Sequence, residues 1–493
     1  MSTEPSFEEL QSRLRKLWPA VTARSVGELE RTVIVVHSLS LDLPPLFAPV
    51  LGAYEERFLC LVLSLLRSPR SRVVYVTSQP ILRRVVDYWF ELVPELDTPE
   101  TRDRLTLISV VDGRPEPLTR KLLAHPGVLE RIRRAIPDPG LAVILPFTVS
   151  ELEAELATRL GVPLYGAHPS LATWGSKSGS RRAFREAGVS HPFGVEEVGS
   201  VPDVIRAIEA IGTARPLARE VMVKLDNGVT GLGNGIVALN GEGTTERRLR
   251  SIRLEDPDLD PESFFAALER EGGIVEERIT GEQFRSPSVQ LRVGPVGEID
   301  VLSTHDQVLG GPNEGQFMGA RFPAAPGYAG ALAEAGRKIA ERLVEKGVLG
   351  RFAVDFATVR RREGWEVYAL EINLRCGGTT HPFMALQTLT EGSYDDRHGL
   401  FVVPGGRPKC YVATDHLEGE HYGRLTPDDF FDLLPEHHLG WDVEHQIGLV
   451  FHLVSAIAVA GLVGVTAIGN SPAEAQALFD RARAVLDEAS STL

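Results

Sequence analysis

Cysteine is scarce in this chain of 493 residues, which contains only three. Cys60, Cys376 and Cys410 are too few and too widely separated for a disulfide framework, a pattern typical of a reducing compartment. We therefore expect a cytoplasmic protein. Cys60 lies in an apolar, helix-like run and is predicted to belong to a core. Cys376 follows Arg375 directly and is expected to line any site there, although no histidine partner for a nucleophilic thiol is apparent.

A basic excess is also missing, because 52 Lys and Arg residues stand against 67 Asp and Glu residues, for a net charge of −15. A general nucleic-acid-binding surface needs a basic face, so we expect no nucleic-acid partner. The first residues lack the charged and apolar segments of a signal peptide, so none is expected. The hydrophobic fraction of 43% excludes wholesale disorder. The length predicts about three folding units.

Long uncharged runs are absent except at 448–469, a segment without Asp, Glu, Lys or Arg. Its length would suffice to cross a bilayer, and a membrane span is one interpretation. His452 and Gly461 within the run, and its acidic rather than basic flank, argue against that interpretation. We expect no membrane partner, and we predict a buried helix over 449–460 followed by a strand over 462–468.

Apolar runs of strand length alternate with helical stretches in the first third of the chain, which predicts a parallel sheet covered by helices. The expected strands are Val33–His37, Val73–Thr77, Leu105–Val110 and Leu141–Phe147. The sequence predicts a multidomain protein of mixed α/β and α+β class. Its units are an N-terminal extension at 1–30, an α/β domain at 31–165, a central domain at 166–400 and a small C-terminal domain at 401–493.

Two apolar runs in the central domain carry acidic side chains where strands are expected. Asp355 lies in the first, and Glu371 and Asn373 lie two residues apart in the second, so these two share a face of their strand. A turn at 360–364 would pair the two strands. Two carboxylates and an amide oxygen suit Mg²⁺, which takes its other ligands from water and phosphates. The alternative is a salt-bridged sheet surface on which Arg375 pairs with Glu371.

A glycine-rich segment follows the expected strand 220–225 and carries glycines at 228, 231, 233 and 235. Such a segment bends sharply and turns N–H groups toward phosphate oxygens, with Lys224 as a cation at its edge. Another strand follows, whereas a dinucleotide fingerprint requires a helix and a P-loop requires Gly-Lys-Ser/Thr. The lysine precedes the loop, and the His-Arg-Asp and Asp-Phe-Gly motifs of kinases are missing. The alternative is an ordinary flexible hairpin with a solvated lysine.

In their order and spacing, these features together with Lys177 and the run 276–279 resemble an ATP-grasp ligase over residues 160–395. The resemblance implies an ATP-grasp fold, with the first α/β domain as its pre-grasp domain, and the use of ATP and Mg²⁺. It implies that ATP is held by Lys177, Lys224, Gly228, Gly231, Gly233, Glu276, Glu277, Ile279 and Gln283. It places the metal on Asp355, Glu371 and Asn373 and gives catalytic roles to Arg375 and Lys224. Gln283 stands where the family often has a ribose-binding Glu, and a Gln can still hydrogen-bond a hydroxyl.

Three phrases, at 174–181, 224–228 and 371–382, are similar to the pheganomycin-type peptide ligases. This resemblance implies that an amino-acid-like carboxylate is joined through an acyl phosphate to an amine, either an amino acid or a peptide N-terminus. The rival hypothesis is an ATP-binding protein that has lost catalysis and acts as a regulator or partner. The sequence leaves a homo-oligomer open.

Several further residues are candidates for supporting roles. The glycine-rich segment 310–324 is expected to cover the substrate, with Arg321 as a carboxylate contact. The general base for the amine is not identified, and the candidates for it are His305, Asp306 and His381. Four histidines suggest zinc only weakly because no cysteines accompany them. They are His416, His421, His437 and His438.

Overall fold

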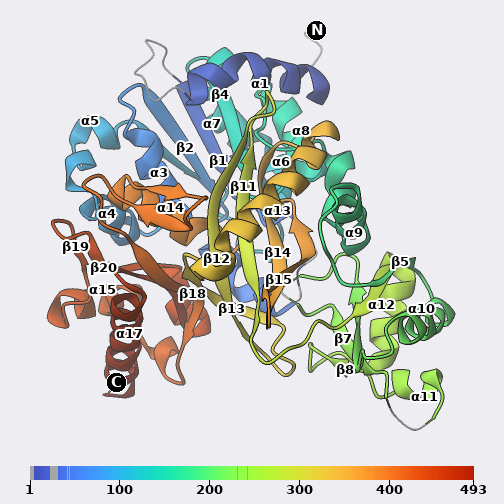
Figure 1. Ribbon diagram of the computed structural model, residues 1–493. Helices are drawn as coiled ribbons and strands as arrows, with labels where there is room; N and C mark the ends of the chain where they lie inside the picture. The colour runs from blue at the N-terminus through green and yellow to red at the C-terminus, as the bar shows by residue number, and fades with distance from the viewer. Residues whose placement is uncertain are drawn as a thin grey trace.

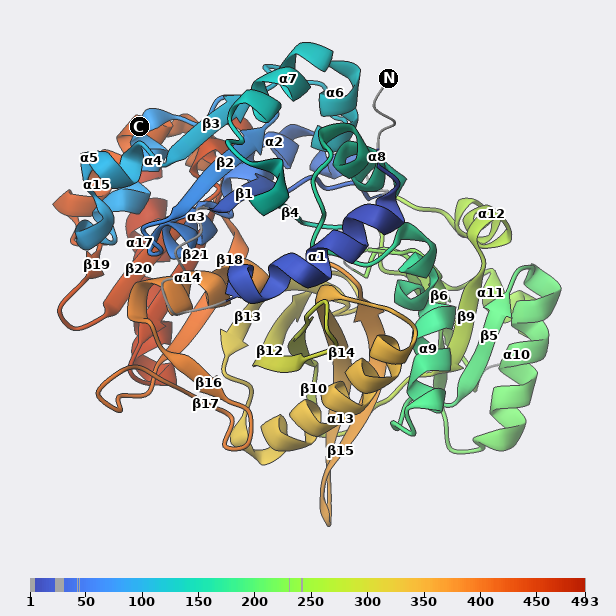
Figure 2. The same cartoon turned by 90° about the horizontal axis from the view of Figure 1, so that it is seen from above.

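The computed structural model describes residues 5–22, 31–41, 43, 45–229, 231–240 and 243–492. Three sheets organise the chain, and Figure 1 shows the regions around them as a blue region, a green lobe and a yellow-to-red region. Figure 2 shows from above that the green lobe projects to one side of the other two.

The first sheet confirms the parallel sheet predicted for the first third of the chain, because its four strands are parallel in the order β3-β2-β1-β4. The strands are β1 (Arg31–Val36), β2 (Ser71–Thr77), β3 (Leu105–Ser109) and β4 (Ala142–Pro146). The helices are α1 (Phe7–Thr22), α2 (Leu51–Glu56), α3 (Leu59–Leu66), α4 (Arg83–Glu91), α5 (Pro99–Arg102), α6 (Leu118–Ala124), α7 (Pro126–Arg134) and α8 (Glu151–Leu160). Helix α8 begins with the reciprocal capping contacts of Ser150 and Glu153.

The green lobe is built on a five-stranded antiparallel sheet in the order β5-β9-β6-β7-β8. Its elements are β5 (Gly194–Val198), α10 (Val201–Ala214), β6 (Glu220–Leu225), β7 (Asn234–Ala238), α11 (Thr245–Leu249), β8 (Arg253–Leu254), α12 (Pro261–Glu271) and β9 (Gly273–Glu277). Helix α9 (Lys177–Glu186) leads into the lobe. Val223, Phe264 and Val275 are fully buried between the sheet and its helices.

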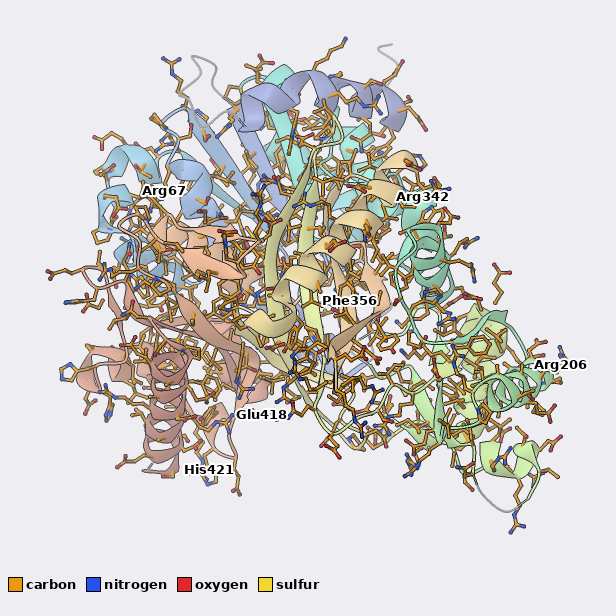
Figure 3. The ribbon with its side chains drawn as sticks, in the orientation of Figure 1. Arg67, Arg206, Arg342, Phe356, Glu418 and His421 are labelled. Atoms are coloured by element: carbon orange, nitrogen blue, oxygen red, sulfur yellow. The ribbon has the colours of Figure 1, made fainter. Side chains whose placement is uncertain are left out.

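The largest sheet lies at the centre and carries the acidic strands. Its strands up to residue 390 are β10 (Phe284–Arg285), β11 (Pro287–Val293), β12 (Ile299–Gly310), β13 (Gln316–Phe322), β14 (Gly350–Arg361) and β15 (Gly364–Asn373). The helices of this region are α13 (Pro326–Glu345) and α14 (Thr380–Thr390). The short hairpin of β16 (Ser393–Asp395) and β17 (Leu400–Val402) follows. Phe356 on β14 is fully buried and lies at the middle of the molecule, as Figure 3 shows. Helix α13 packs against β11 and β12.

The C-terminal strands extend this central sheet, because β18 pairs with β13. The elements are β18 (Cys410–Glu418), α15 (Pro427–Glu436), β19 (Trp441–Asp442), β20 (Ile447–His452), α16 (Ile457–Ala460), β21 (Leu462–Gly469) and α17 (Pro472–Thr492). The central sheet thus continues past residue 400. The domain boundaries drawn from the sequence, at 30, 165 and 400, stay predictions.

The helix predicted over 449–460 is wrong in its first half. Residues 447–452 form strand β20, which pairs antiparallel with β21. A short apolar run buried on both faces cannot be assigned to helix or strand from periodicity alone, and here Val450 and Phe451 favour the strand. The strand predicted over 462–468 is confirmed as β21. None of the helices in the described ranges combines the length and apolar character that crossing a bilayer requires.

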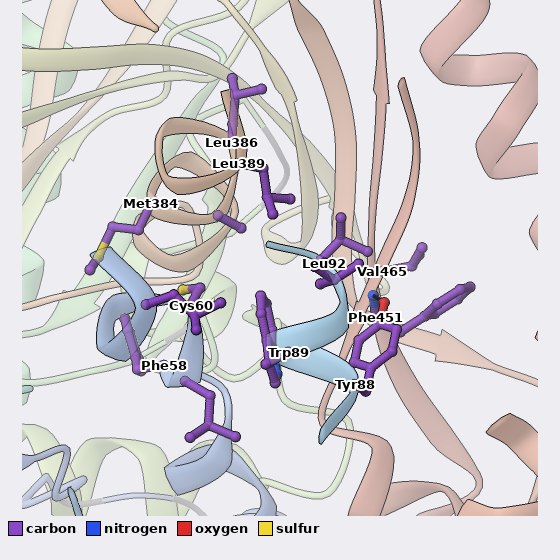
Figure 4. Packing of buried hydrophobic residues seen from close by; sticks show 14 of the residues in the cluster. Phe58, Cys60, Tyr88, Trp89, Leu92, Met384, Leu386, Leu389, Phe451 and Val465 are labelled. Carbon is purple, nitrogen blue, oxygen red and sulfur yellow. Dashed lines mark hydrogen bonds between the residues drawn. The ribbon is translucent and has the colours of Figure 1, made fainter. Parts of the chain in front are cut away.

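One apolar core joins the first and last parts of the chain. Figure 4 shows Cys60 of α3 beside Met384 of α14, and Tyr88 of α4 beside Phe451 of β20. The Phe451 N–H donates to Tyr88 Oη at 2.9 Å. Cys60 is fully buried, as the sequence predicts. The α/β domain is thus fixed against the C-terminal strands, and it is not a separately hinged unit.

A buried ion pair crosses the same interface. Arg57 pairs with Asp415, and their side chains are 3% and 5% exposed. His452 Nε2 lies 2.8 Å from the second Asp415 oxygen, and His381 lies 3.3 Å from it. Burial alone would raise the pKa of Asp415, but Arg57 and the two histidines hold it well below its usual range. The carboxylate is therefore charged and balances the guanidinium.

We predict that Asp415→Ala strongly destabilises the protein, because it leaves the Arg57 guanidinium buried without a counter-ion. Such a loss costs about 3–5 kcal/mol. Thermal unfolding would measure it. The matched control is Arg206→Ala, which removes an exposed pair with Asp203 on α10, at the edge of the molecule in Figure 3. That pair is exposed to solvent and contributes little to stability. Equal unfolding midpoints for the two variants would contradict the assignment.

Candidate active site

The acidic strands pair as the sequence predicts. Strands β14 and β15 are antiparallel neighbours, and Asp355 lies directly opposite Glu371. Asn373 lies opposite Ala353, two residues further along. The turn between the strands is short, since β14 ends at 361 and β15 begins at 364. The hairpin therefore brings two carboxylates and an amide to one place.

Asp355 is held by a set of amide donors. Gln307 Nε2 donates to its Oδ1 at 2.7 Å and Asn373 Nδ2 donates to its Oδ2 at 2.9 Å. Burial and the nearby charge of Glu371 raise the pKa of Asp355 to about 7. Gln307 was not anticipated, because it lies on β12 and only the sheet order brings it near. The sequence around it carries no signal for this role.

Lys177 connects the acidic strands with the glycine segment. It is the first residue of α9, after Ser176, whose side chain caps the helix. Its Nζ donates to Glu371 Oε1 at 2.7 Å and to the Gly228 carbonyl oxygen at 3.0 Å. The lysine is buried. Glu371 pairs with Lys177, and not with Arg375, which was its expected partner in the alternative of a salt-bridged sheet surface. The predicted first lysine thus lies at the metal-site residues.

The glycine segment is a closed hairpin between β6 and β7. Gly228 and Gly233 stack backbone to backbone, since a Cβ on Gly228 would lie 3.0 Å from the Gly233 Cα. Gly231 has a φ of +86°, and a Cβ there would lie 2.2 Å from the Gly315 carbonyl oxygen. Gly315 belongs to the connection between β12 and β13. The two hairpin tips therefore touch, and only glycine fits at their contact.

The segment expected to cover the substrate, 310–324, comprises this β12–β13 connection and the whole of β13. It reaches the glycine hairpin and Glu255, whose carboxylate accepts from the Gly315 N–H at 3.2 Å. Arg321 does not act as expected: its Nη2 donates to Gln476 Oε1 at 3.4 Å, toward α17. Arg321 is not among the residues that line the cavity described below.

Lys224 and Glu276 form a buried charge cluster with Arg181. Lys224 Nζ lies 2.6 Å from Glu276 Oε1, and Arg181 Nη1 lies 2.7 Å from Glu276 Oε2. Both carboxylate oxygens of Glu276 are thus paired with cations, and the residue is 1% exposed. Strand β6 lies directly beside β9, with Met222 opposite Glu276. The predicted second lysine and the predicted hinge residue are therefore neighbours.

The remaining predicted nucleotide contacts follow β9. Glu277 accepts from the Phe193 N–H at 2.8 Å. Ile279 comes just after the strand ends. Gln283 is exposed, and its backbone carbonyl oxygen accepts from the backbone N–H of Arg360 at 3.2 Å. Their contacts with a nucleotide stay predictions.

A cavity of about 1240 Å³ joins these elements to the first domain. Four predicted site residues line it: Gly228, Glu371, Asn373 and Arg375. The opposite wall includes His37, Phe58 and the segment 147–150. Phe147 also accepts from the Cys376 N–H through its carbonyl oxygen at 3.0 Å. The α/β domain therefore forms one wall of the cavity that holds the acidic strands.

Cys376 lines the cavity, as expected from its position after Arg375. Burial raises the pKa of its thiol, and the charges of Arg351, Arg57 and Arg375 offset part of that rise. A thiol with a raised pKa is a poor nucleophile. The structure gives Cys376 a lining role.

The three candidate bases are engaged elsewhere, and none of them lines the cavity. His305 Nε2 lies 2.6 Å from Tyr411 Oη, and burial lowers its pKa to about 3. Asp306 accepts from Tyr328 Oη at 2.5 Å and from the Ala325 N–H. His381 belongs to the buried cluster around Asp415. Their partners lie on other elements of the fold and could not be foreseen from their sequence neighbours.

The four histidines considered for zinc do not assemble. Among the described residues, the one group of three or more metal-ligating side chains that converge is His381, Asp415 and His452. Arg57 balances the charge of that group, because it pairs with Asp415 Oδ2 while the two histidines lie near Oδ1.

The acidic strands fit Mg²⁺. Their donors are carboxylate and amide oxygens, the ligands that hard divalent cations prefer. Burial, followed by the neighbouring charge of Glu371, raises the pKa of Asp355, and a divalent cation bound there would favour the charged carboxylate. Lys177 and Arg375 place cations beside Glu371 and Asn373, and Lys177 also contacts the glycine hairpin through the Gly228 carbonyl oxygen. The arrangement is suited to holding phosphate groups beside a reacting carboxylate.

Comparisons with known proteins agree with this geometry. The model of the IQCH-like ATP-grasp family matches residues 260–397. The chain is 33% identical over 448 residues to L-propargylglycine–L-glutamate ligase of Streptantibioticus cattleyicolor. This alignment covers 89% of this chain and 90% of that protein. It is 21% identical over 508 residues to IQ motif-containing protein H of Danio rerio, across 91% of this chain and 47% of that protein.

Solved structures agree on the fold. The N5-carboxyaminoimidazole ribonucleotide synthetase of Thermus thermophilus aligns with a TM-score of 0.52 at 15% identity, over 92% of this chain and 98% of that chain. An ADP complex of such a synthetase aligns with a TM-score of 0.53 at 13% identity, over 95% and 100% of the two chains. At these identities the likeness concerns the fold, which is the predicted ATP-grasp fold. From the relative that is 33% identical over most of its length, we conclude that this chain belongs to the ATP-grasp family and is an ATP-dependent carboxylate–amine ligase.

Proposed function

We propose that this ligase joins the carboxylate of an amino acid to the amine of a second amino acid or of a peptide. The observation that carries the proposal is that Glu371, Asn373, Arg375 and the glycine hairpin open into one cavity, which the first domain walls off on the other side. The 33% identical relative is named for joining two amino acids, which supports the substrate class.

ATP is needed because a carboxylate has no leaving group that an amine can displace. A carboxylate oxygen attacks the γ-phosphorus of ATP, ADP leaves, and an acyl phosphate forms. The amine nitrogen then attacks the acyl carbon, inorganic phosphate leaves, and the nitrogen loses a proton. Phosphoryl transfer asks the protein mainly for positioning and for neutralisation of charge.

Asp355, Glu371 and Asn373 would hold Mg²⁺, which when bound offsets the charge of the phosphate oxygens. Lys177 now pairs with Glu371 and would turn its ammonium toward phosphate oxygens when a nucleotide is present. Lys224 would approach the nucleotide from the edge of the glycine hairpin, with Glu276, Glu277, Ile279 and Gln283 along the adenosine. These roles follow the positions of the residues around β6, β9 and β15.

Arg375 is the residue we assign to the reacting carboxylate. Its Nη2 donates to Asn373 Oδ1 at 3.1 Å and its Nη1 donates to the Cys376 carbonyl oxygen at 3.0 Å. These two bonds fix the planar guanidinium beside the metal-site residues. A fixed cation at that point stabilises negative charge that develops on the acyl oxygen. The wall from the first domain limits water, which would otherwise hydrolyse the acyl phosphate.

A regulator that binds ATP without turnover is not favoured, since the acidic residues and both lysines are present together. The deciding experiment offers ATP with L-glutamate, L-propargylglycine and a panel of other amino acids and short peptides. We expect ADP release that depends on both an acid and an amine, and an amide product detected by mass spectrometry. ATP binding without ADP release across the whole panel would overturn the proposal.

We predict that Glu371→Ala and Asn373→Ala each lower ADP formation at least about a hundredfold, because charge neutralisation at the phosphates is lost. Circular dichroism should show an unchanged fold. The matched control is Glu366→Ala on the same strand, since Glu366 is half exposed and pairs with Arg361. Undiminished turnover in the first two variants would refute the site.

We predict that Gly231→Ala raises the KM for ATP about tenfold, because its φ is unfavourable for alanine and its Cβ would strike the Gly315 carbonyl. Steady-state kinetics of ADP release would measure this. Gly212→Ala on α10 is the control, since no atom lies within 4 Å of a Cβ there. The hairpin's role would be disproved by equal KM values in the two variants.

A further inference from the structure

Six arginines line the cavity, and they differ in their partners. Arg67 pairs with Glu95 and Glu391, Arg270 pairs with Glu271, and Arg292 pairs with Asp300. Arg31 donates to Ser71 Oγ at 2.7 Å, and Arg375 is fixed by the bonds described above. Arg351 is different, because within the described part of the chain no carboxylate lies within ion-pair distance of its guanidinium.

Arg351 is also without side-chain hydrogen bonds to the described residues, and its Nη1 is fully shielded from solvent. Burial lowers the pKa of its guanidinium. A guanidinium stays charged in proteins nonetheless. A shielded cation without a counter-ion is costly unless a ligand supplies one. The cavity that Arg351 lines is the place from which such a ligand can come.

The strand geometry relates Arg351 to the reaction centre. Arg351 lies four residues before Asp355 on β14, so the two side chains leave the same face of the strand. Their Cα atoms are about 13 Å apart at the usual rise of a strand. Phe352 and Val354, on the opposite face, pack into the core under α13. Arg351 thus reaches into the same space as the metal-site residues, but at a distance from them.

The groups around Arg351 leave its charge unbalanced. The thiol of Cys376 lies within the electrostatic influence of Arg351 and Arg375. Burial and the charges of Arg57 and Arg351 lower the pKa of His37 to about 3, so that imidazole is neutral. Tyr165 donates its hydroxyl to the Val293 carbonyl oxygen at 3.0 Å. The charges of Arg292 and Asp300 also reach Arg351, but these two residues pair with each other, so this end of the cavity keeps the positive charge of Arg351.

We propose that Arg351 binds a substrate carboxylate that is not the one activated. The inference rests on the proposed function and refines it. The arrangement provides two separate carboxylate positions in one cavity, with Arg375 for the carboxylate that becomes the amide and Arg351 for one that stays free. Arg351 therefore selects substrates with a free carboxylate, which either the acid or the amine can carry.

Two pairs of compounds test whether the free carboxylate that Arg351 binds belongs to the acid or to the amine. L-Glutamate is compared with its α-amide, L-isoglutamine, as the acid, and L-propargylglycine is compared with its carboxamide as the amine. ADP release by the wild type and by Arg351→Met gives kcat/KM for each compound. For the compound whose free carboxylate Arg351 binds, we expect kcat/KM to fall about a hundredfold in the variant, mainly through KM. For the amide of that compound, we expect kcat/KM to change less than about threefold in the variant. The amide carries no negative charge, so it gains little from the charge of Arg351.

Arg351→Lys should recover part of the preference for the carboxylate, since it keeps the charge but not the two-pronged geometry. Arg292→Met is the matched control, because Arg292 lies opposite Arg351 on β11 and already has Asp300 as its partner. We expect this control to keep the wild-type preference for acid over amide.

The outcomes separate the two ideas. An Arg351→Met enzyme that keeps the full wild-type preference in both pairs would overturn this inference while leaving the ligase intact. An equal loss for each acid and its amide would also overturn it, since it would mean that Arg351 only supports the fold. A wild-type enzyme that releases no ADP with any of these compounds, or with the wider panel, would instead overturn the proposed function and this inference with it.

Discussion

Two carboxylates on neighbouring strands repel each other unless cations lie close by, and this constraint organises the centre of the protein. Asp355 and Glu371 face each other across β14 and β15, and the pKa of Asp355 rises because it is buried beside that second charge. Lys177 balances the charge of one of the two carboxylates, because it pairs with Glu371. A divalent cation and the nucleotide that it accompanies would balance the charge of Asp355. Binding of a magnesium–nucleotide complex would thus relieve a strain that folding has built in.

The same lysine links chemistry to closure. Its ammonium also donates to the Gly228 carbonyl, so the hairpin that would cover the phosphates is tied to a metal-site residue. The second contact, between Gly231 and Gly315, joins this hairpin to the β12–β13 connection. The green lobe is therefore held against the central sheet at both hairpin tips. Glycine is required there because backbones meet with no room for a side chain.

The cavity depends on a rigid wall that comes from far away in the sequence. The α/β domain is fixed to the C-terminal strands by a common apolar core and by the buried pair of Arg57 and Asp415. This attachment places His37 and Phe147 in the lining of the same cavity as Arg375 and Cys376. The wall therefore owes its position to packing at the C-terminal end of the chain, which supplies no residue of the nucleotide site.

Local patterns in the sequence sufficed for the strands of the first domain, the capped helix after Ser150, the acidic hairpin and the glycine hairpin. Each of them depends on alternation, turn residues or spacing within a short stretch, and the order of the motifs carried the family. The tertiary structure alone decided which distant groups meet: Gln307 on Asp355, Arg181 and Lys224 on Glu276, and Arg57 on Asp415. It also turned Arg321 away from the cavity, buried His305, and made residues 447–452 a strand. These outcomes depend on sheet order and on desolvation, and both are set by contacts between residues that lie far apart along the chain.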